Sequence, residues 1–364
     1  MPSPNRPRVI VAMSGGVDSS VAAARLARAG LDVVGVTLHL WDYPDDGSVR
    51  GRCCAPEDQH DARRTADVLG IPHYAFDRRE GFSREVVTPF VDAYLAGETP
   101  SPCVACNRGP KLRELFQLAD RLGAERIATG HYARVVRDER GVPWLASARD
   151  AHKDQSYFLH SLTKAELERL ELPLGDATKD EVRAEAVALG LPGATKGDSQ
   201  ELCFVPTGRY DAFVEARADG RVRPGAILAG GREVGRHGGV HRFTVGQRKG
   251  IGVALGEPAF VVGIDPETAT VHLGPQEALG TISVTADDAR FHDDAPRELR
   301  ARVKVRARHE GAMATVRRRD DGVVEVQFDE PVRAVSVGQY VVAHDGERVL
   351  GGARIVTVHG AEVA

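Results

Sequence analysis

Short apolar runs alternate with amphipathic stretches along the first part of the chain. Residues 9–13 and 32–38 are β-branched runs with the composition of strands buried on both faces. Apolar positions at helical spacing follow, over residues 18–30, 60–69, 83–96 and 111–122, and another strand ends near residue 130. This alternation predicts an α/β fold built on a Rossmann-like, doubly wound parallel sheet.

The pattern changes after about residue 204. Dense glycines and short apolar pieces between residues 208 and 280 predict a small β-rich module. Apolar and polar residues then alternate more sharply, with strands expected near residues 300–308, 323–328 and 340–343, which favours a small β-barrel. We therefore predict three domains: a catalytic α/β domain over residues 1–205, a central β-rich domain over 206–280 and a C-terminal β-barrel over 281–364.

Composition narrows the class of protein. The 364 residues are 42% hydrophobic and 27% charged, which excludes disordered and collagen-like chains. The net charge of −4 argues against a uniformly cationic coat but leaves room for a local basic patch. The first residues lack the long apolar stretch of a signal peptide, and no apolar run approaches the ~20 residues that a membrane helix needs. Five cysteines in such a chain fit a reducing cytoplasm, so we expect a soluble cytoplasmic protein with no membrane partner.

A glycine-rich octet lies where the first strand meets the first helix. It runs Met13-Ser14-Gly15-Gly16-Val17-Asp18-Ser19-Ser20. Unpaired N–H groups and the positive end of the helix dipole can cradle a phosphate there. A Gly-Lys-Ser/Thr ending is missing, so this is not a Walker A loop. A tight turn capped by Asp18 or Ser20 is the alternative, but the full octet favours nucleotide binding.

The cysteines are the second candidate feature. Cys103 and Cys106 form a Cys-x-x-Cys pair in a proline-rich stretch, and Cys106 precedes a helix with Arg108 and Lys111 nearby, which favours a partly ionised thiol. A structural zinc site needs four ligands and no second such pair exists, so no metal site is expected. Cys203 stands where the α/β pattern ends, and we expect Cys53 and Cys54 to be inert and buried.

Basic residues alternate with small or apolar ones over residues 300–308. On a strand, this spacing places all five cations on one face. A solvated outer face of a barrel is the alternative, but five like charges on one face favour contact with RNA phosphates.

The octet resembles the pyrophosphate-binding loop of the N-type ATP pyrophosphatases, which include argininosuccinate, asparagine and GMP synthetases and RNA-thiolating enzymes. Beyond the octet, nearly the whole chain resembles one family within this group, the bacterial tRNA-specific 2-thiouridylases. That resemblance rests on the octet, on Cys53-Cys54 with Asp58, Asp61, Ala62 and Arg63, and on segments 99–107, 128–134, 153–159, 202–204 and 243–252.

The resemblance implies roles for individual residues. It implies ATP contacts at Ala12, Met13, Ser14, Gly15, Gly16, Val17, Asp18, Ser19, Leu38 and Gly130. It makes Cys106 the nucleophilic thiol and Cys203 the persulfide carrier. It assigns Ser101, Pro102 and Cys103 to the target base, and Lys153, Asp154, Gln155, Arg306 and Ala307 to tRNA. Two positions depart from the family, since many members carry Asp at position 103 and Tyr at position 307.

The activity implied is ATP-dependent 2-thiolation of the wobble uridine in tRNAs for Lys, Glu and Gln. The uridine 2-oxygen is adenylylated by ATP with Mg²⁺, and sulfur arrives from a cysteine persulfide. A cysteine desulfurase or a sulfur-relay protein would supply that sulfur. Two other functions stay open: an amidotransferase-type synthetase, which needs an ammonia source and no thiols, and a non-catalytic tRNA-binding protein with a vestigial ATP fold.

Overall fold

The computed structural model describes residues 6–42, 56–194, 196–197, 202–205 and 208–360. The chain divides into two compact units. The first holds residues 1–86, 103–208 and 347–349, and the second holds residues 87–102, 209–346 and 350–364. Each unit is described by itself below.

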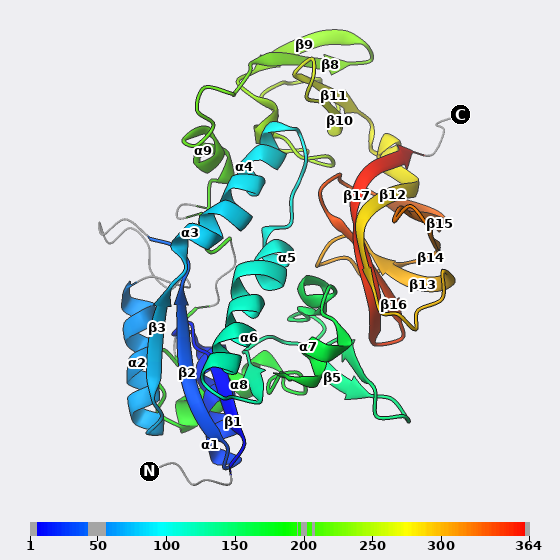
Figure 1. Ribbon diagram of the computed structural model, residues 1–364. Helices are drawn as coiled ribbons and strands as arrows, with labels where there is room; N and C mark the ends of the chain where they lie inside the picture. Colours follow the sequence, from blue (N-terminus) through cyan, green and yellow to red (C-terminus); the bar gives the residue numbers. More distant parts are fainter. Residues whose placement is uncertain (1–5, 43–55, 195, 198–201, 206–207, 361–364) are drawn as a thin grey trace. The chain divides into compact units, whose positions relative to one another are not determined.

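A five-stranded parallel sheet forms the centre of the first unit (Figure 1). Its order is β3-β2-β1-β4-β7, from β1 (Arg8–Ala12), β2 (Asp32–His39), β3 (His73–Asp77), β4 (Arg126–Ala128) and β7 (Leu170–Glu171). Val9, Ile10 and Val11 of β1 are at most 2% exposed, because β1 lies between β2 and β4 with helices over the sheet. The predicted Rossmann-like parallel sheet is therefore confirmed.

Helices connect these strands and cover the sheet. They are α1 (Val17–Arg28), α2 (Pro56–Leu69), α3 (Arg79–Phe82), α5 (Pro102–Cys106), α6 (Leu112–Arg121), α7 (Lys164–Glu168) and α8 (Lys179–Ala188), with the 3₁₀ turn η3 (Ser156–Leu159) and a hairpin of β5 (Arg134–Arg137) and β6 (Pro143–Ala146). The helix predicted over residues 83–96 instead begins as a π-helical turn, η1 (Ser83–Val87). It continues as α4 (Thr88–Leu95), which belongs to the second unit.

The second unit contains a small sheet of order β10-β11-β8-β9. Its strands are β8 (Gly225–Ala229), β9 (Arg232–His237), β10 (Phe260–Asp265) and β11 (Thr270–Gly274), with α9 (Tyr210–Glu215) and the 3₁₀ turn η4 (Val240–Arg242). Their inward side chains, such as Ile227, Val261 and Val271, are at most 1% exposed. This sheet is the central β-rich module that the glycine pattern predicts.

A six-stranded barrel completes the second unit. After the turn η5 (Gln276–Leu279) it comprises β12 (Gly280–Phe291), β13 (Glu298–Lys304), β14 (Ala312–Arg318), β15 (Val324–Arg333), β16 (Tyr340–Asp345) and β17 (Arg348–Gly360). Pairing of β12 with both β15 and β17 closes it. The predicted barrel is thus confirmed, and valines and alanines fill its interior.

The basic strand is shorter than predicted. The expectation of five cations on one strand face over residues 300–308 is wrong, because β13 ends at Lys304 and residues 305–308 form the turn toward β14. The last pair of the β13–β14 hairpin is Val303 with Ala312, so the chain must reverse between them. Arg300, Arg302 and Lys304 alternate with buried Ala301 and Val303 on the strand.

Candidate functional site

The glycine loop is held in shape by its own serines. The backbone N–H of Ser14 donates to Ser19 Oγ at 3.1 Å, and Ser19 Oγ donates to the carbonyl of Gly16 at 3.1 Å. Gly16 is the N-cap of α1 and has no side chain to occupy the helix N-terminus. The first N–H groups of α1 are therefore available to an anion, which suits the phosphates of a nucleotide.

Gly15 meets two requirements at once. Its φ of +77° lies in the left-handed region, which favours glycine. A Cβ atom there would also lie 1.9 Å from the carbonyl oxygen of Asp58, in the first turn of α2. The glycine therefore lets the loop lie directly against α2.

The other predicted ATP residues lie at the same edge of the sheet. The N–H of Met13 donates to the carbonyl of Val36 in β2, and Thr37 Oγ1 donates to the carbonyl of Met13 at 2.6 Å. Gly130 follows β4, and a Cβ atom there would lie 2.8 Å from the backbone nitrogen of Ser19. Leu38 lies near the end of β2 and is buried. This edge, at the carboxyl ends of β1, β2 and β4, is the usual ligand-binding crevice of such sheets.

The side chain of Asp18 is engaged within the protein. Its carboxylate accepts hydrogen bonds from Lys179 Nζ at 2.7 and 2.8 Å and from the Tyr132 hydroxyl at 2.7 Å. Lys179 opens α8, so this ion pair ties α8 to the first turn of α1. Sequence reasoning missed Lys179, because no local pattern links it to a residue so distant in the chain.

A neutral histidine lies just beyond Gly130. His131 is 6% exposed, and burial, with the Lys111 ammonium adding to it, lowers its pKa well below the ordinary value. Lys111 Nζ lies 3.1 Å from His131 Nε2, and Thr129 Oγ1 lies 2.7 Å from His131 Nδ1. Since an ammonium can only donate, Nε2 accepts and Nδ1 carries the proton toward Thr129. The Lys111 ammonium thus donates to a neutral imidazole ring at this edge.

The Cys-x-x-Cys pair lies in a short helix. Cys103 and Cys106 both belong to α5 and both are half-buried. Asn107 is buried, and its Nδ2 donates to the carbonyl of Cys103 at 3.0 Å. Next comes the π-helical turn η2 (Asn107–Lys111), in which Gly109 departs from helical geometry. Such turns widen a helix and are frequent at functional sites.

Cys203 is held near the same edge by its neighbour. Phe204 is 2% exposed, and its ring lies 5.7 Å from the Phe82 ring and 6.2 Å from the Trp41 ring, in edge-to-face geometry. Trp41 comes just after β2, so this cluster ties the Cys203 segment to the carboxyl end of β2. Cys203 itself is half-buried. The expectation for Cys53 and Cys54 falls outside the described residues.

The other residues assigned to tRNA lie in two places. In the first unit, Gln155 pairs with Tyr132, since Gln155 Oε1 accepts from the Tyr132 N–H at 2.9 Å. Asp154 accepts from the N–H groups of Ala148 and Ser156, and Lys153 is half-buried beside it. Arg306 and Ala307 lie in the turn after β13, in the second unit.

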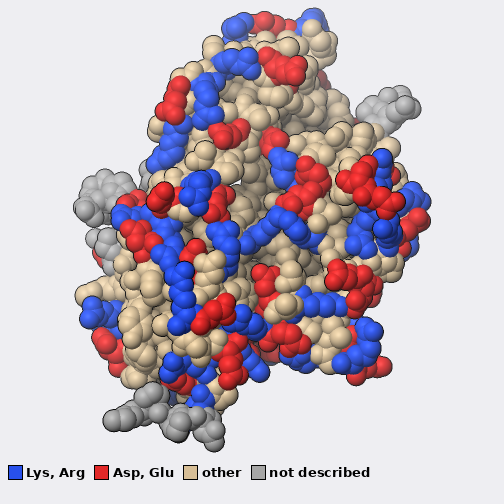
Figure 2. Space-filling view, in the orientation of Figure 1, with Lys and Arg blue, Asp and Glu red and all other residues tan. Residues whose placement is uncertain are grey.

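The arginines on β13 and in the turn after it differ in whether a carboxylate pairs with them. Arg300 makes two hydrogen bonds of 2.6 Å to the carboxylate of Asp329, which neutralises it. Arg302 donates to the carbonyl of Gly311, and Arg306 to the carbonyls of Arg333 and Ala334. A carbonyl carries no net charge, so Arg302 and Arg306 stay cationic. Figure 2 shows blue and red side chains mixed over the barrel on the face drawn there.

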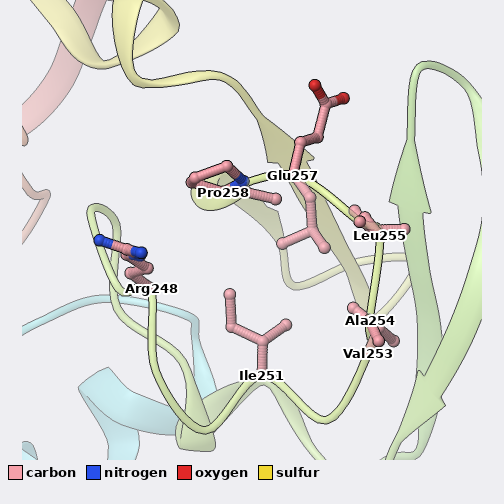
Figure 3. Close-up of a pocket in the computed structure, with 10 residues that line it drawn as sticks. Arg248, Ile251, Val253, Ala254, Leu255, Glu257 and Pro258 are labelled. Atoms are coloured by element: carbon pink, nitrogen blue, oxygen red, sulfur yellow. The ribbon is translucent and has the colours of Figure 1, made fainter.

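The predicted segment 243–252 contributes to a cavity of about 390 Å³ in the second unit. In Figure 3, Ile251 points into this cavity and the carboxylate of Glu257 points away from it. Most of the lining residues carry apolar side chains, Arg248 lies at one side, and the lining contains no thiol. We assign no chemistry to it.

The described residues contain neither a metal-binding cluster nor a membrane-spanning helix. No cluster of three or more His, Cys, Asp or Glu side chains has an arrangement that would hold a metal ion. Within those same residues, no helix combines the length and apolarity needed to cross a membrane.

Comparison with known proteins assigns each part of the chain to a family. Residues 7–207 match the family described as tRNA methyl transferase HUP domain, residues 212–275 its PRC-barrel domain, and residues 282–355 the aminomethyltransferase beta-barrel domain. A protein of Sorangium cellulosum named tRNA-specific 2-thiouridylase MnmA is 65% identical over 96% of this chain and 92% of its own length. Proteins of the same name from Chloroflexus aggregans and Solibacter usitatus are 48% and 47% identical, over 94% and 96% of this chain and 97% and 99% of their own lengths.

Proposed function

This chain belongs to the family of tRNA-specific 2-thiouridylases, enzymes that transfer sulfur to uridine in tRNA, and we propose that it thiolates the wobble uridine of tRNAs for Lys, Glu and Gln. One observation carries the proposal. The glycine-rich loop, the η2 turn that follows Cys106 and the Cys203 segment all lie at the carboxyl edge of one parallel sheet, by way of the start of α1, the Lys111–His131 contact and the Phe204–Trp41 contact. Adenylylation and sulfur transfer need these three parts together.

The first step proposed is adenylylation. The loop from Ala12 to Ser19 would bind the phosphates of ATP, and Mg²⁺ bound with ATP would offset their negative charge. The uridine is flipped out of its stack toward Ser101, Pro102 and Cys103. Its 2-oxygen attacks the α-phosphorus, the bond to the β-phosphate oxygen breaks, and pyrophosphate leaves as the N3 proton is lost. The cationic Lys111 lies at the same edge as this developing charge.

The second step proposed is sulfur transfer. The terminal sulfur of a Cys203 persulfide attacks carbon 2, and AMP leaves with the former 2-oxygen. The Cys106 thiolate attacks Cys203 Sγ, the sulfur–sulfur bond of the persulfide breaks, and a Cys106–Cys203 disulfide forms. In the alternative order, Cys106 first releases the sulfur as sulfide, which then attacks. Either route ends in a disulfide that a dithiol must reduce by two electrons.

The proposed partners follow from this chemistry. A cysteine desulfurase or a sulfur-relay protein loads the persulfide on Cys203, and the reaction takes place in the cytoplasm. Lys153, Asp154, Gln155, Arg306 and Ala307 contact tRNA. Ala307 offers no ring for stacking, so contact there rests on the backbone and on Arg306.

A product assay on the intact protein tests the proposal. Incubation with ATP, Mg²⁺, sulfide and unmodified tRNA for Glu is expected to yield 2-thiouridine, detected by nucleoside mass spectrometry, and no product without ATP. The same spectrum reports methylated uridine, the product that the family description would suggest. Pyrophosphate release without 2-thiouridine would overturn the sulfur-transfer proposal.

The arginines on β13 and in the turn after it lead to a prediction for tRNA binding. Replacing Arg302 and Arg306 together by Gln should weaken binding and lower the slope of log affinity against log salt by about two, one for each lost phosphate contact. Arg300→Gln is the matched control, because Asp329 already neutralises Arg300. Binding by fluorescence anisotropy at several salt concentrations measures both. Unchanged affinity and slope in the double variant would show that Arg302 and Arg306 face solvent and do not contact tRNA.

A further inference from the structure

Lys196 forms ion pairs with two acidic residues of α2. Its Nζ lies 2.7 Å from Asp58 Oδ1 and 2.5 Å from Asp61 Oδ2. Both carboxylates belong to the first turns of α2, and Lys196 comes shortly before Cys203 in the chain. One ammonium thus bridges two acidic groups, at a position seven residues before the proposed sulfur carrier in the sequence.

The same contacts reach the phosphate-binding loop. Gly15 lies so close to the Asp58 carbonyl that a Cβ atom would approach it to 1.9 Å. A Cβ atom at Gly193, whose φ is +75°, would lie 3.3 Å from the carbonyl oxygen of Gly15 and 3.4 Å from Cδ of Lys196. The loop, the first turn of α2 and the turn that carries Lys196 therefore meet at one point.

The pair is buried enough to hold its place. Asp58 is 3% exposed, and burial raises its pKa while Lys196 opposes that rise. Its Oδ2 is buried and, within the described part of the chain, has no hydrogen-bond partner. Because a buried carboxylate without its cation is costly, the Lys196 ammonium stays attached to this point.

We propose that Lys196 is a positioning residue that, through Asp58 and Asp61, holds its own turn, seven residues before Cys203 in the sequence, against the phosphate-binding loop. The sulfur carrier then reaches the adenylylated uridine from a fixed starting point. This inference rests on the proposed function, because it assigns Lys196 to the sulfur-transfer step alone. A residue of this kind acts through geometry, and a displacement of about 1 Å can slow such a step by about a hundredfold.

Separate assays of the two steps test this role. Lys196→Met keeps the length of the side chain and removes its charge. We expect it to slow 2-thiouridine formation from a persulfide-loaded donor about tenfold or more, with tRNA-dependent AMP formation within about twofold of wild type. Lys196→Arg keeps the charge and should recover most of the lost rate. Free sulfide at high concentration should rescue Lys196→Met, because it bypasses the carrier.

Arg25→Met serves as the matched control. Arg25 lies in the last turn of α1, is about as exposed as Lys196 and pairs with Glu185 of α8, so its loss removes an ion pair between two helices without touching the junction. Equal loss of both steps in Lys196→Met would overturn the proposal, as would unchanged persulfide-dependent thiolation. Should Lys196→Met fail to fold, Asp61→Asn decides by the same two rates, because it leaves Asp58 paired. If the proposed function itself were wrong, the wild-type protein would form neither AMP nor 2-thiouridine, which distinguishes that outcome from a failure of the Lys196 proposal.

Discussion

Replacing Cys203 by Ser should abolish persulfide-dependent formation of 2-thiouridine, a loss of about a thousandfold or more, while AMP still forms. A hydroxyl cannot carry a sulfane sulfur, so the transfer step loses its donor. The fold should survive, because Phe204 rather than Cys203 holds this segment in the aromatic cluster with Trp41 and Phe82. Nucleoside mass spectrometry measures the product, and AMP release serves as the internal control.

Cys106→Ser separates the two thiol roles. It should still accept a persulfide on Cys203, visible in the intact-protein mass, but should fail to turn over, because the thiol that is proposed to close the disulfide is gone. An active Cys203→Ser enzyme would contradict the carrier assignment, and an active Cys106→Ser enzyme the nucleophile assignment.

Gly15→Ala should remove ATP binding and destabilise the first unit. The new Cβ atom would lie 1.9 Å from the Asp58 carbonyl oxygen, so the loop or α2 must move, and the φ of +77° adds strain. We expect a loss of roughly 2–3 kcal/mol in the free energy of unfolding. Isothermal titration with ATP and urea unfolding measure the two effects.

Gly30→Ala is the control for that substitution. Gly30 has a similar φ of +82°, but nothing lies within 4 Å of its Cβ position. The Gly30→Ala variant should lose roughly 1 kcal/mol in the free energy of unfolding, the cost of a left-handed backbone conformation for alanine, and should bind ATP normally. If Gly15→Ala bound ATP as tightly as Gly30→Ala, close contact with α2 would not explain the glycine.

Local patterns predicted the fold well wherever neighbours in the chain decide the structure. The β-branched run at residues 9–13 became the buried β1, and the octet after it became the loop that opens α1. Periodicity failed where distant contacts intervene. It predicted a strand to residue 308, but pairing of Val303 with Ala312 forces the chain to turn earlier. The proline-rich Cys-x-x-Cys stretch likewise folds as a helix, α5, followed by the π-helical turn η2, which its local sequence did not predict.

The sequence by itself determined the α/β class, the glycine-rich loop between β1 and α1 and the positions of the thiols, because spacing along one strand or helix carries that information. Only the tertiary structure decided which charges meet. It pairs Lys196 with Asp58 and Asp61, and Lys111 with a neutral His131. It also shows that Asp329 neutralises Arg300 while Arg302 keeps its charge. Such pairs join residues far apart in the chain, and their electrostatic energies depend on distance and burial, which only the packed structure determines.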